Sequence, residues 1–127
     1  MNAIKNTLDF LKEKLFIGLD VHKAQWTVTF RMLGMKLKTH TMNPDPNELF
    51  RYLVKHYPGA EYYSVYESGF CGFWAHRKLV ELSIKNIVFN AADIPTTDKE
   101  KKHKRDKVDS RKIARELENG SLEAIYI

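Results

Sequence analysis

The chain has 127 residues, a net charge of +5 and 43% hydrophobic residues, which fits one domain large enough to bury a core. Its apolar runs are too short to span a membrane, and its N-terminal stretch carries acids and lacks the apolar core of a signal peptide. Cys71 is the single cysteine, which excludes an intrachain disulfide. We therefore expect one domain of a cytoplasmic protein that has no membrane partner.

The first half of the chain predicts a helix followed by a three-stranded meander. Apolar residues at helical spacing predict a lead-in helix over residues 1–14. A buried-strand run over residues 15–20 ends in Asp20, and alternating runs at 24–33 and 35–42 predict two further strands, with Trp26 expected in the core.

The second half alternates between helices and strands. The predicted elements are a helix at 48–57, a strand at 62–66, a helix at 73–82, a strand at 84–89, a basic flexible connection at 91–105 and a helix at 106–119. Trp74 is expected near the core, and Gly120 is placed to end the last helix. This order predicts an α/β fold with a mixed five-stranded sheet flanked by helices.

Four acidic residues stand at the ends of these elements. Asp20 ends the first strand and Glu67 ends the fourth, and these two strands would be neighbours in a sheet of this order. Asp106 and Asp109 are spaced i, i+3 at the start of the last helix, so they share the stripe that turns Ile113 toward the sheet. We therefore expect the four carboxylates to converge.

Converging carboxylates need a counter-charge. Two of them about 5 Å apart repel by roughly 3 kcal/mol at an effective dielectric constant near 20, and a divalent cation removes that cost. All-oxygen sites suit Mg²⁺ or Mn²⁺, and two such ions would clamp the attacking and leaving oxygens of a phosphodiester. Each acid alone is also explained as a turn, cap or helix-dipole residue, whereas the four together favour a metal-dependent nuclease.

Positive charge is concentrated in the segment before the last helix. This segment holds six basic and two acidic residues, so it contributes +4 to the chain's net charge of +5. The candidate nucleic-acid-binding residues of this segment are Lys99, Lys101, Lys102, Lys104, Arg105 and Lys107. A solvated loop is the alternative. His22 and Lys23, directly after Asp20, are further candidates for contacts with phosphate or with the outer ligands of the metal.

Three segments resemble the motifs of the DEDD transposases, the insertion-sequence enzymes related to the Piv DNA invertase. IGLDVHK at residues 17–23 resembles their opening GxDVHK motif, and YESG at residues 66–69 resembles their second, acidic motif. KRDKVDSRKIA at residues 104–114 resembles the third, commonly KTDRxDAxxLA. In the third motif, Arg105 replaces the usual threonine, Lys107 the usual arginine and Ser110 the usual alanine. None of these replacements removes a carboxylate. The resemblance covers residues 17–127.

The resemblance implies an RNase H or RuvC-like fold in a bacterial enzyme that cleaves and exchanges DNA strands at the nucleoid. It implies that Asp20, Glu67, Asp106 and Asp109 are the catalytic tetrad and bind Mg²⁺ or Mn²⁺. DNA is the implied partner, some members are guided by a structured RNA encoded by the element, and the full-length enzyme is expected to form a homo-oligomer. Members continue into a second domain with a serine nucleophile, so we expect these 127 residues to be an incomplete recombinase.

Three alternatives stay open. A RuvC-type Holliday-junction resolvase needs the same four acids and no second domain. A sugar-kinase or actin-like ATPase would need a glycine-rich phosphate loop after the first strand, and residues 21–25 contain no glycine. A non-catalytic nucleic-acid-binding or dimerisation relic would retain its acids by descent.

Overall fold

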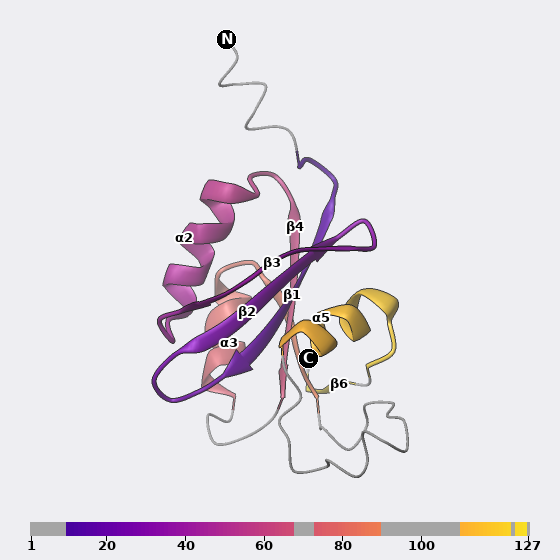
Figure 1. The fold of residues 1–127 in the computed structure, drawn as a ribbon. Helices are drawn as coiled ribbons and strands as arrows, with labels where there is room; N and C mark the ends of the chain where they lie inside the picture. The colour runs from indigo at the N-terminus through magenta and orange to yellow at the C-terminus, as the bar shows by residue number, and fades with distance from the viewer. Residues whose placement is uncertain (1–9, 68–72, 90–109, 123, 127) are drawn as a thin grey trace.

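The computed structural model describes residues 10–67, 73–89, 110–122 and 124–126. They form a mixed sheet of six strands in the order β3-β2-β1-β4-β5-β6. Helices α2 and α3 cover one face of this sheet and helix α5 covers the other (Figure 1). The strands are β1 Lys14–Val21, β2 Trp26–Met32, β3 Met35–Met42, β4 Glu61–Glu67, β5 Lys85–Phe89 and β6 Ala124–Tyr126. The helices are α2 Pro46–His56, α3 Trp74–Glu81 and α5 Ser110–Asn119.

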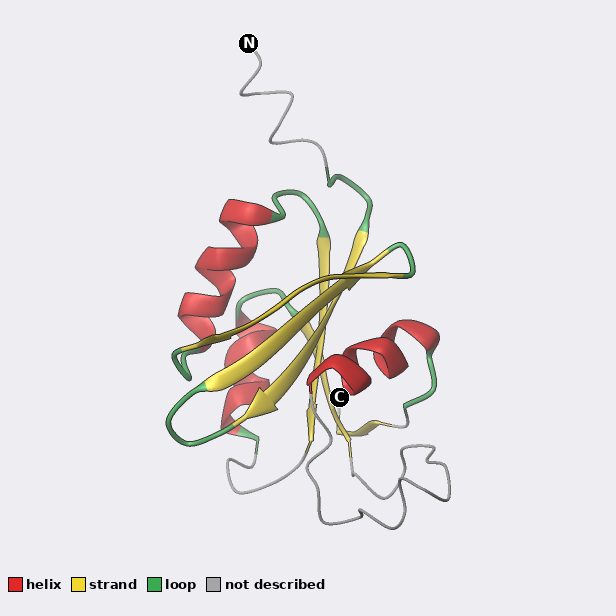
Figure 2. Cartoon of the chain, in the orientation of Figure 1, coloured by secondary structure: helices red, strands yellow, loops and turns green. Residues whose placement is uncertain are grey.

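The predicted meander and the α/β alternation are both confirmed (Figure 2). β1, β2 and β3 pair antiparallel, and the β2–β3 turn has positive φ at both central residues, Leu33 and Gly34, as a tight hairpin turn requires. β4 then pairs parallel with β1 on its free side, and β5 pairs parallel with β4. The prediction of five strands was short by one, because β6 pairs antiparallel with β5.

The main core lies between the sheet and helices α2 and α3. Trp26, Val28 and Phe30 point to this face and are fully buried, which confirms the expected alternation of β2. Leu15, Ile17 and Leu19 of β1 join them, together with Leu49 and Leu53 of α2 and Leu79 of α3. Burial of a large apolar side chain contributes about 1.5–3 kcal/mol, so this layer supplies most of the stabilisation.

The helix ends follow local sequence rules. Asp45 caps α2 by accepting a hydrogen bond from the Asn47 amide at 2.9 Å, and Pro46 occupies the first turn. Gly120 has φ 75° after α5, and its amide donates to the Leu117 carbonyl at 3.1 Å, as in a glycine C-cap. The expected stop at Gly120 is confirmed. Within the described residues, no helix combines the length and apolar character needed to cross a membrane.

Two expectations about the N-terminal half and α3 need correction. The lead-in helix falls partly on residues outside the described ranges, but residues 10–12 form a turn and Lys14 begins β1. Leu15 is fully buried and pairs with Tyr62, which confirms the strand predicted to begin there. Trp74 is 42% exposed and only touches the core through a tilted contact with Trp26 at 6.5 Å.

Candidate active site

The structure places Asp20 and Glu67 side by side at the carboxyl ends of two parallel strands. The register pairs Gly18 with Val65 and Leu19 with Tyr66, so one further step aligns the two acids. Residues aligned across neighbouring parallel strands point to the same face of a sheet. Val65 packs with Ile113 of α5, so both carboxylates belong to the face that α5 covers. Their role as metal ligands stays a prediction.

Helix α5 begins directly over β1. Gly18 faces α5, and a Cβ there would lie 2.7 Å from the Ala114 amide nitrogen and closer still to the Ser110 carbonyl oxygen. Only glycine permits this approach, because the conflicting atoms are backbone. Ser110, the first residue of α5, is therefore held against a point on β1 two residues before Asp20.

Two hydroxyl contacts fix the same end of α5. The Ser110 Oγ lies 2.8 Å from the Thr29 Oγ1, and that atom lies 2.8 Å from the Thr39 Oγ1. Ser110 and Thr29 are 1% and 0% exposed, so the hydrogen bond between them is shielded from water. The sequence placed Ser110 on the inward face of the last helix and marked it as a departure from the family's alanine, but it did not indicate the partner. Its partner lies 81 residues earlier in the chain, so no local pattern could reveal it.

His22 contacts a candidate acid directly. Its Nε2 lies 3.2 Å from the Asp20 Oδ2, and its side chain is 41% exposed, against 16% for Asp20. The His22 amide donates to the Gln25 carbonyl at 3.1 Å, which closes the β1–β2 turn and leaves Lys23 exposed at its tip. Histidine in this position can orient the carboxylate.

The remaining predicted site residues lie outside the described ranges. They are Asp106 and Asp109 of the tetrad and the basic residues Lys99, Lys101, Lys102, Lys104, Arg105 and Lys107. Over residues 10–67, 73–89, 110–122 and 124–126, no three His, Cys, Asp or Glu side chains are grouped to hold a metal. Asp20 and Glu67 alone supply half of the predicted tetrad.

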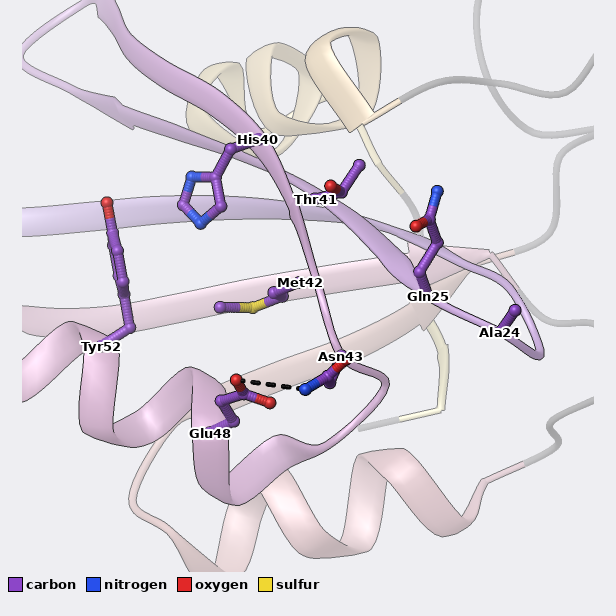
Figure 3. A pocket seen from close by; sticks show the side chains of 8 residues that line it. All are labelled: Ala24, Gln25, His40, Thr41, Met42, Asn43, Glu48 and Tyr52. Carbon is purple, nitrogen blue, oxygen red and sulfur yellow. Dashed lines mark hydrogen bonds between the residues drawn. The ribbon is translucent and has the colours of Figure 1, made fainter.

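A groove of about 450 Å³ lies beyond the β1–β2 turn (Figure 3). It runs along the end of β3 toward the first turn of α2 and is lined by Ala24, Gln25, His40, Thr41, Met42, Asn43, Glu48 and Tyr52. At its floor, the Asn43 amide donates weakly to the Glu48 carboxylate at 3.5 Å. Sequence reasoning missed this groove, because its walls come from three separate elements.

The fold and the acid pair define a mixed α/β domain with two carboxylates at the carboxyl ends of its central strands, β1 and β4. The chain is similar to the protein named "Putative transposase y4rJ" from Sinorhizobium fredii (strain NBRC 101917 / NGR234), with 29% identity over 81% of its residues. The chain spans 29% of the length of that relative. No family model matches the chain. The similarity supports a relationship to transposases.

Proposed function

We propose that this chain is the RNase H-like domain of a DNA transposase or site-specific recombinase and serves metal-dependent cleavage and exchange of DNA strands. One observation carries the proposal: Asp20 and Glu67 lie in register at the ends of parallel strands and face the same helix. The similarity to a protein named as a transposase supports it independently.

The sheet order and the position of α5 support the finer assignment of the fold. A meander followed by parallel strands, with α5 crossing β1, matches what the resemblance to DEDD transposases implies. The third motif leads into α5 at Ser110, which is anchored on Gly18. Asp109 directly precedes Ser110 in the sequence, and we propose that the acids of this motif complete the site begun by Asp20 and Glu67.

The residues present fit a hard divalent cation. Asp20 and Glu67 supply carboxylate oxygens, the ligands that Mg²⁺ and Mn²⁺ prefer, and adjacent like charges favour a cation between them. When bound, the metal would polarise the scissile phosphate and its attacking oxygen. His22 holds the second oxygen of Asp20 in place, and Lys23 offers a cation to the DNA backbone from the same turn.

Recombination by this chain alone is not expected. The relative is more than three times as long as the matched part, which supports the presence of further domains in such enzymes. The domain would then activate and orient a phosphodiester, while the group that holds the cut strand lies elsewhere. Labelled DNA incubated with the chain and Mg²⁺ should give no covalent adduct. Efficient junction-specific cleavage would instead favour a resolvase.

A metal-dependent melt tests the site itself. Mn²⁺ at ten times its Kd should stabilise the fold by about 1.4 kcal/mol, which corresponds to a rise in Tm of roughly 5 °C. The double variant Asp20→Asn, Glu67→Gln should lose the shift. The control Glu61→Gln, Glu81→Gln removes two exposed acids away from the site and should keep it. An unchanged shift in the first variant would reject the assigned site.

A further inference from the structure

Aromatic rings and positive charges meet where α2 packs beside β3. We call this the α2–β3 surface and define it by Lys38, His40, Tyr52, Lys55 and His56. The rings of His40 and Tyr52 lie 4.9 Å apart, and those of Tyr52 and His56 lie 4.2 Å apart. Lys38 places its Nζ 5.9 Å from the centre of the Tyr52 ring. A strand and a helix therefore contribute to one continuous patch.

The rings form a stack that leads from the core to solvent. Phe30 is fully buried and stacks on Tyr52 at 5.3 Å with an interplanar angle of 17°. His56 packs on Tyr52 from the outside and is exposed. An exposed ring held by a rigid stack can receive another planar group at little cost in side-chain entropy.

The charge on this surface is positive. Lys55 lies one helical turn from Tyr52 and is exposed beside His56, and Arg51 is exposed one turn before Lys55. Burial holds the pKa of His40 below its ordinary value of 6.5, and the nearby charges of Lys38 and His56 lower it further. The acid of this flank, Glu48, faces the groove and accepts a hydrogen bond from Asn43.

The groove of Figure 3 continues this surface toward the β1–β2 turn. His40 and Tyr52 line both the surface and the groove. Beyond them the lining offers the amides of Gln25 and Asn43 and the hydroxyl of Thr41. Neutral groups that donate and accept hydrogen bonds suit the edges of unpaired bases, and a volume near 450 Å³ admits one.

The groove also lies close to the candidate active site. Gln25 accepts the hydrogen bond of the His22 amide, and His22 contacts Asp20. Thr27 is the β2 partner of Asp20, so Gln25 is two residues further along, roughly 7 Å at the usual strand rise. A polymer lying in the groove would therefore reach the β1–β2 turn that follows Asp20.

We infer that the α2–β3 surface and its groove bind an unpaired nucleic-acid strand, with the surface on the α2 face of the sheet and the groove reaching the β1–β2 turn that follows Asp20. Lys38 and Lys55 contact its phosphates, His56 stacks on a base, and the groove amides read a base edge. A duplex fits less well, because its bases are stacked and their pairing edges are occupied. This goes beyond the proposed function, which places DNA at the acid pair and at Lys23.

Salt-dependent binding in EDTA tests the charged part of the surface. Anisotropy of a labelled single strand should give a slope of log affinity against log salt that falls by about 1.4 in Lys38→Gln, Lys55→Gln, near 0.7 per lost phosphate contact. The control Arg77→Gln, Lys78→Gln removes two exposed charges from α3 and should leave the slope unchanged. Equal losses in both variants, or none in the first, would overturn the proposal.

The groove needs a second variant without a charge change. Gln25→Ala, Asn43→Ala should weaken single-strand binding several-fold at an unaltered salt slope and leave duplex binding unaffected. Thermal melts confirm that each variant is folded. Parallel DNA and RNA strands identify the preferred sugar, and tighter binding of either supports the inference. Duplex binding as tight as single-strand binding would contradict it. Because EDTA removes divalent metal, a failed metal site would not alter these outcomes.

Discussion

The two faces of the sheet are held to their helices by different means. The face toward α2 and α3 is a thick layer of aliphatic and aromatic side chains, with Trp26 and Phe30 at its centre. The face toward α5 carries a small apolar cluster around Val65 and Ile113. On that face, the close backbone contact at Gly18 and the Thr29–Ser110 hydrogen bond fix the position of α5 on the sheet. A thick apolar layer stabilises without demanding one exact placement, whereas close contacts and polar pairs define a position.

The far end of α5 follows the same principle. Glu118 accepts from the Arg31 Nε at 2.8 Å and from the Gly34 amide at 2.8 Å, which ties the helix to the β2–β3 hairpin. Arg31 and Glu118 are 16% and 11% exposed, so this pair is partly shielded from solvent screening. Helix α5, beside the acids, is therefore fixed at both ends. We expect substitutions on the α2/α3 face to lower stability most, and substitutions on the α5 face to disturb the geometry of the acid site.

The largest effect is expected at Trp26. Its replacement by alanine removes a fully buried indole and should lower the free energy of unfolding by about 3–5 kcal/mol. Urea denaturation measures the change. Trp74→Ala is the matched control, because that side chain is 42% exposed and should cost less than half as much. Similar losses from both would contradict the assignment of Trp26 to the core centre.

Gly18→Ala should come next, at about 1–3 kcal/mol, because the new methyl group meets the backbone of α5. The same variant should weaken the Mn²⁺-dependent melting shift by moving the start of α5 away from Asp20. Gly34→Ala strains a positive φ in open space and is the control, with a stability loss but an intact metal shift. An undiminished Mn²⁺-dependent melting shift in Gly18→Ala would show that the position of α5 does not affect the metal site.

A smaller effect is expected from the hydroxyl pair on the α5 face. Ser110→Ala should cost about 1 kcal/mol, the net worth of a buried hydrogen bond, since Thr29 keeps its contact with Thr39. After Thr29→Val the same change should cost much less, which a double-mutant cycle detects from urea melts. Additive losses would show that the two hydroxyls act independently.

The smallest effect concerns His40 on the opposite face. Its pKa is lowered in the folded state by burial, Lys38 and His56, so the unfolded chain binds more protons below the ordinary value of 6.5. The free energy of unfolding should therefore decline as the pH falls from 6.5 toward the lowered folded value. His40→Gln should flatten that decline, which urea denaturation at several pH values measures. An identical pH profile in His40→Gln would remove His40 from this account.

Much of the fold was predictable because it depends on local pattern. Alternation defined β2, and Gly120 marked the end of α5 by the need for a positive φ. The strand order implied that Asp20 and Glu67 would be neighbours, and the register places them one step beyond a paired position. The sequence misled at residues 10–14, where helical spacing predicted a helix but residues 10–12 form a turn and β1 begins at Lys14, and at Trp74, where an apolar side chain stays 42% exposed.

The sequence by itself determined the class of fold, the meander and the edge of the sheet at which acids would gather, because each depends on periodicity and on the direction of consecutive strands. Only the tertiary structure decided that Gly18 receives α5, that Ser110 bonds to Thr29, and that Lys38 joins rings of α2. The physical reason is sequence separation: such contacts form between residues distant in the chain and leave no periodic trace. Packing alone brings them together.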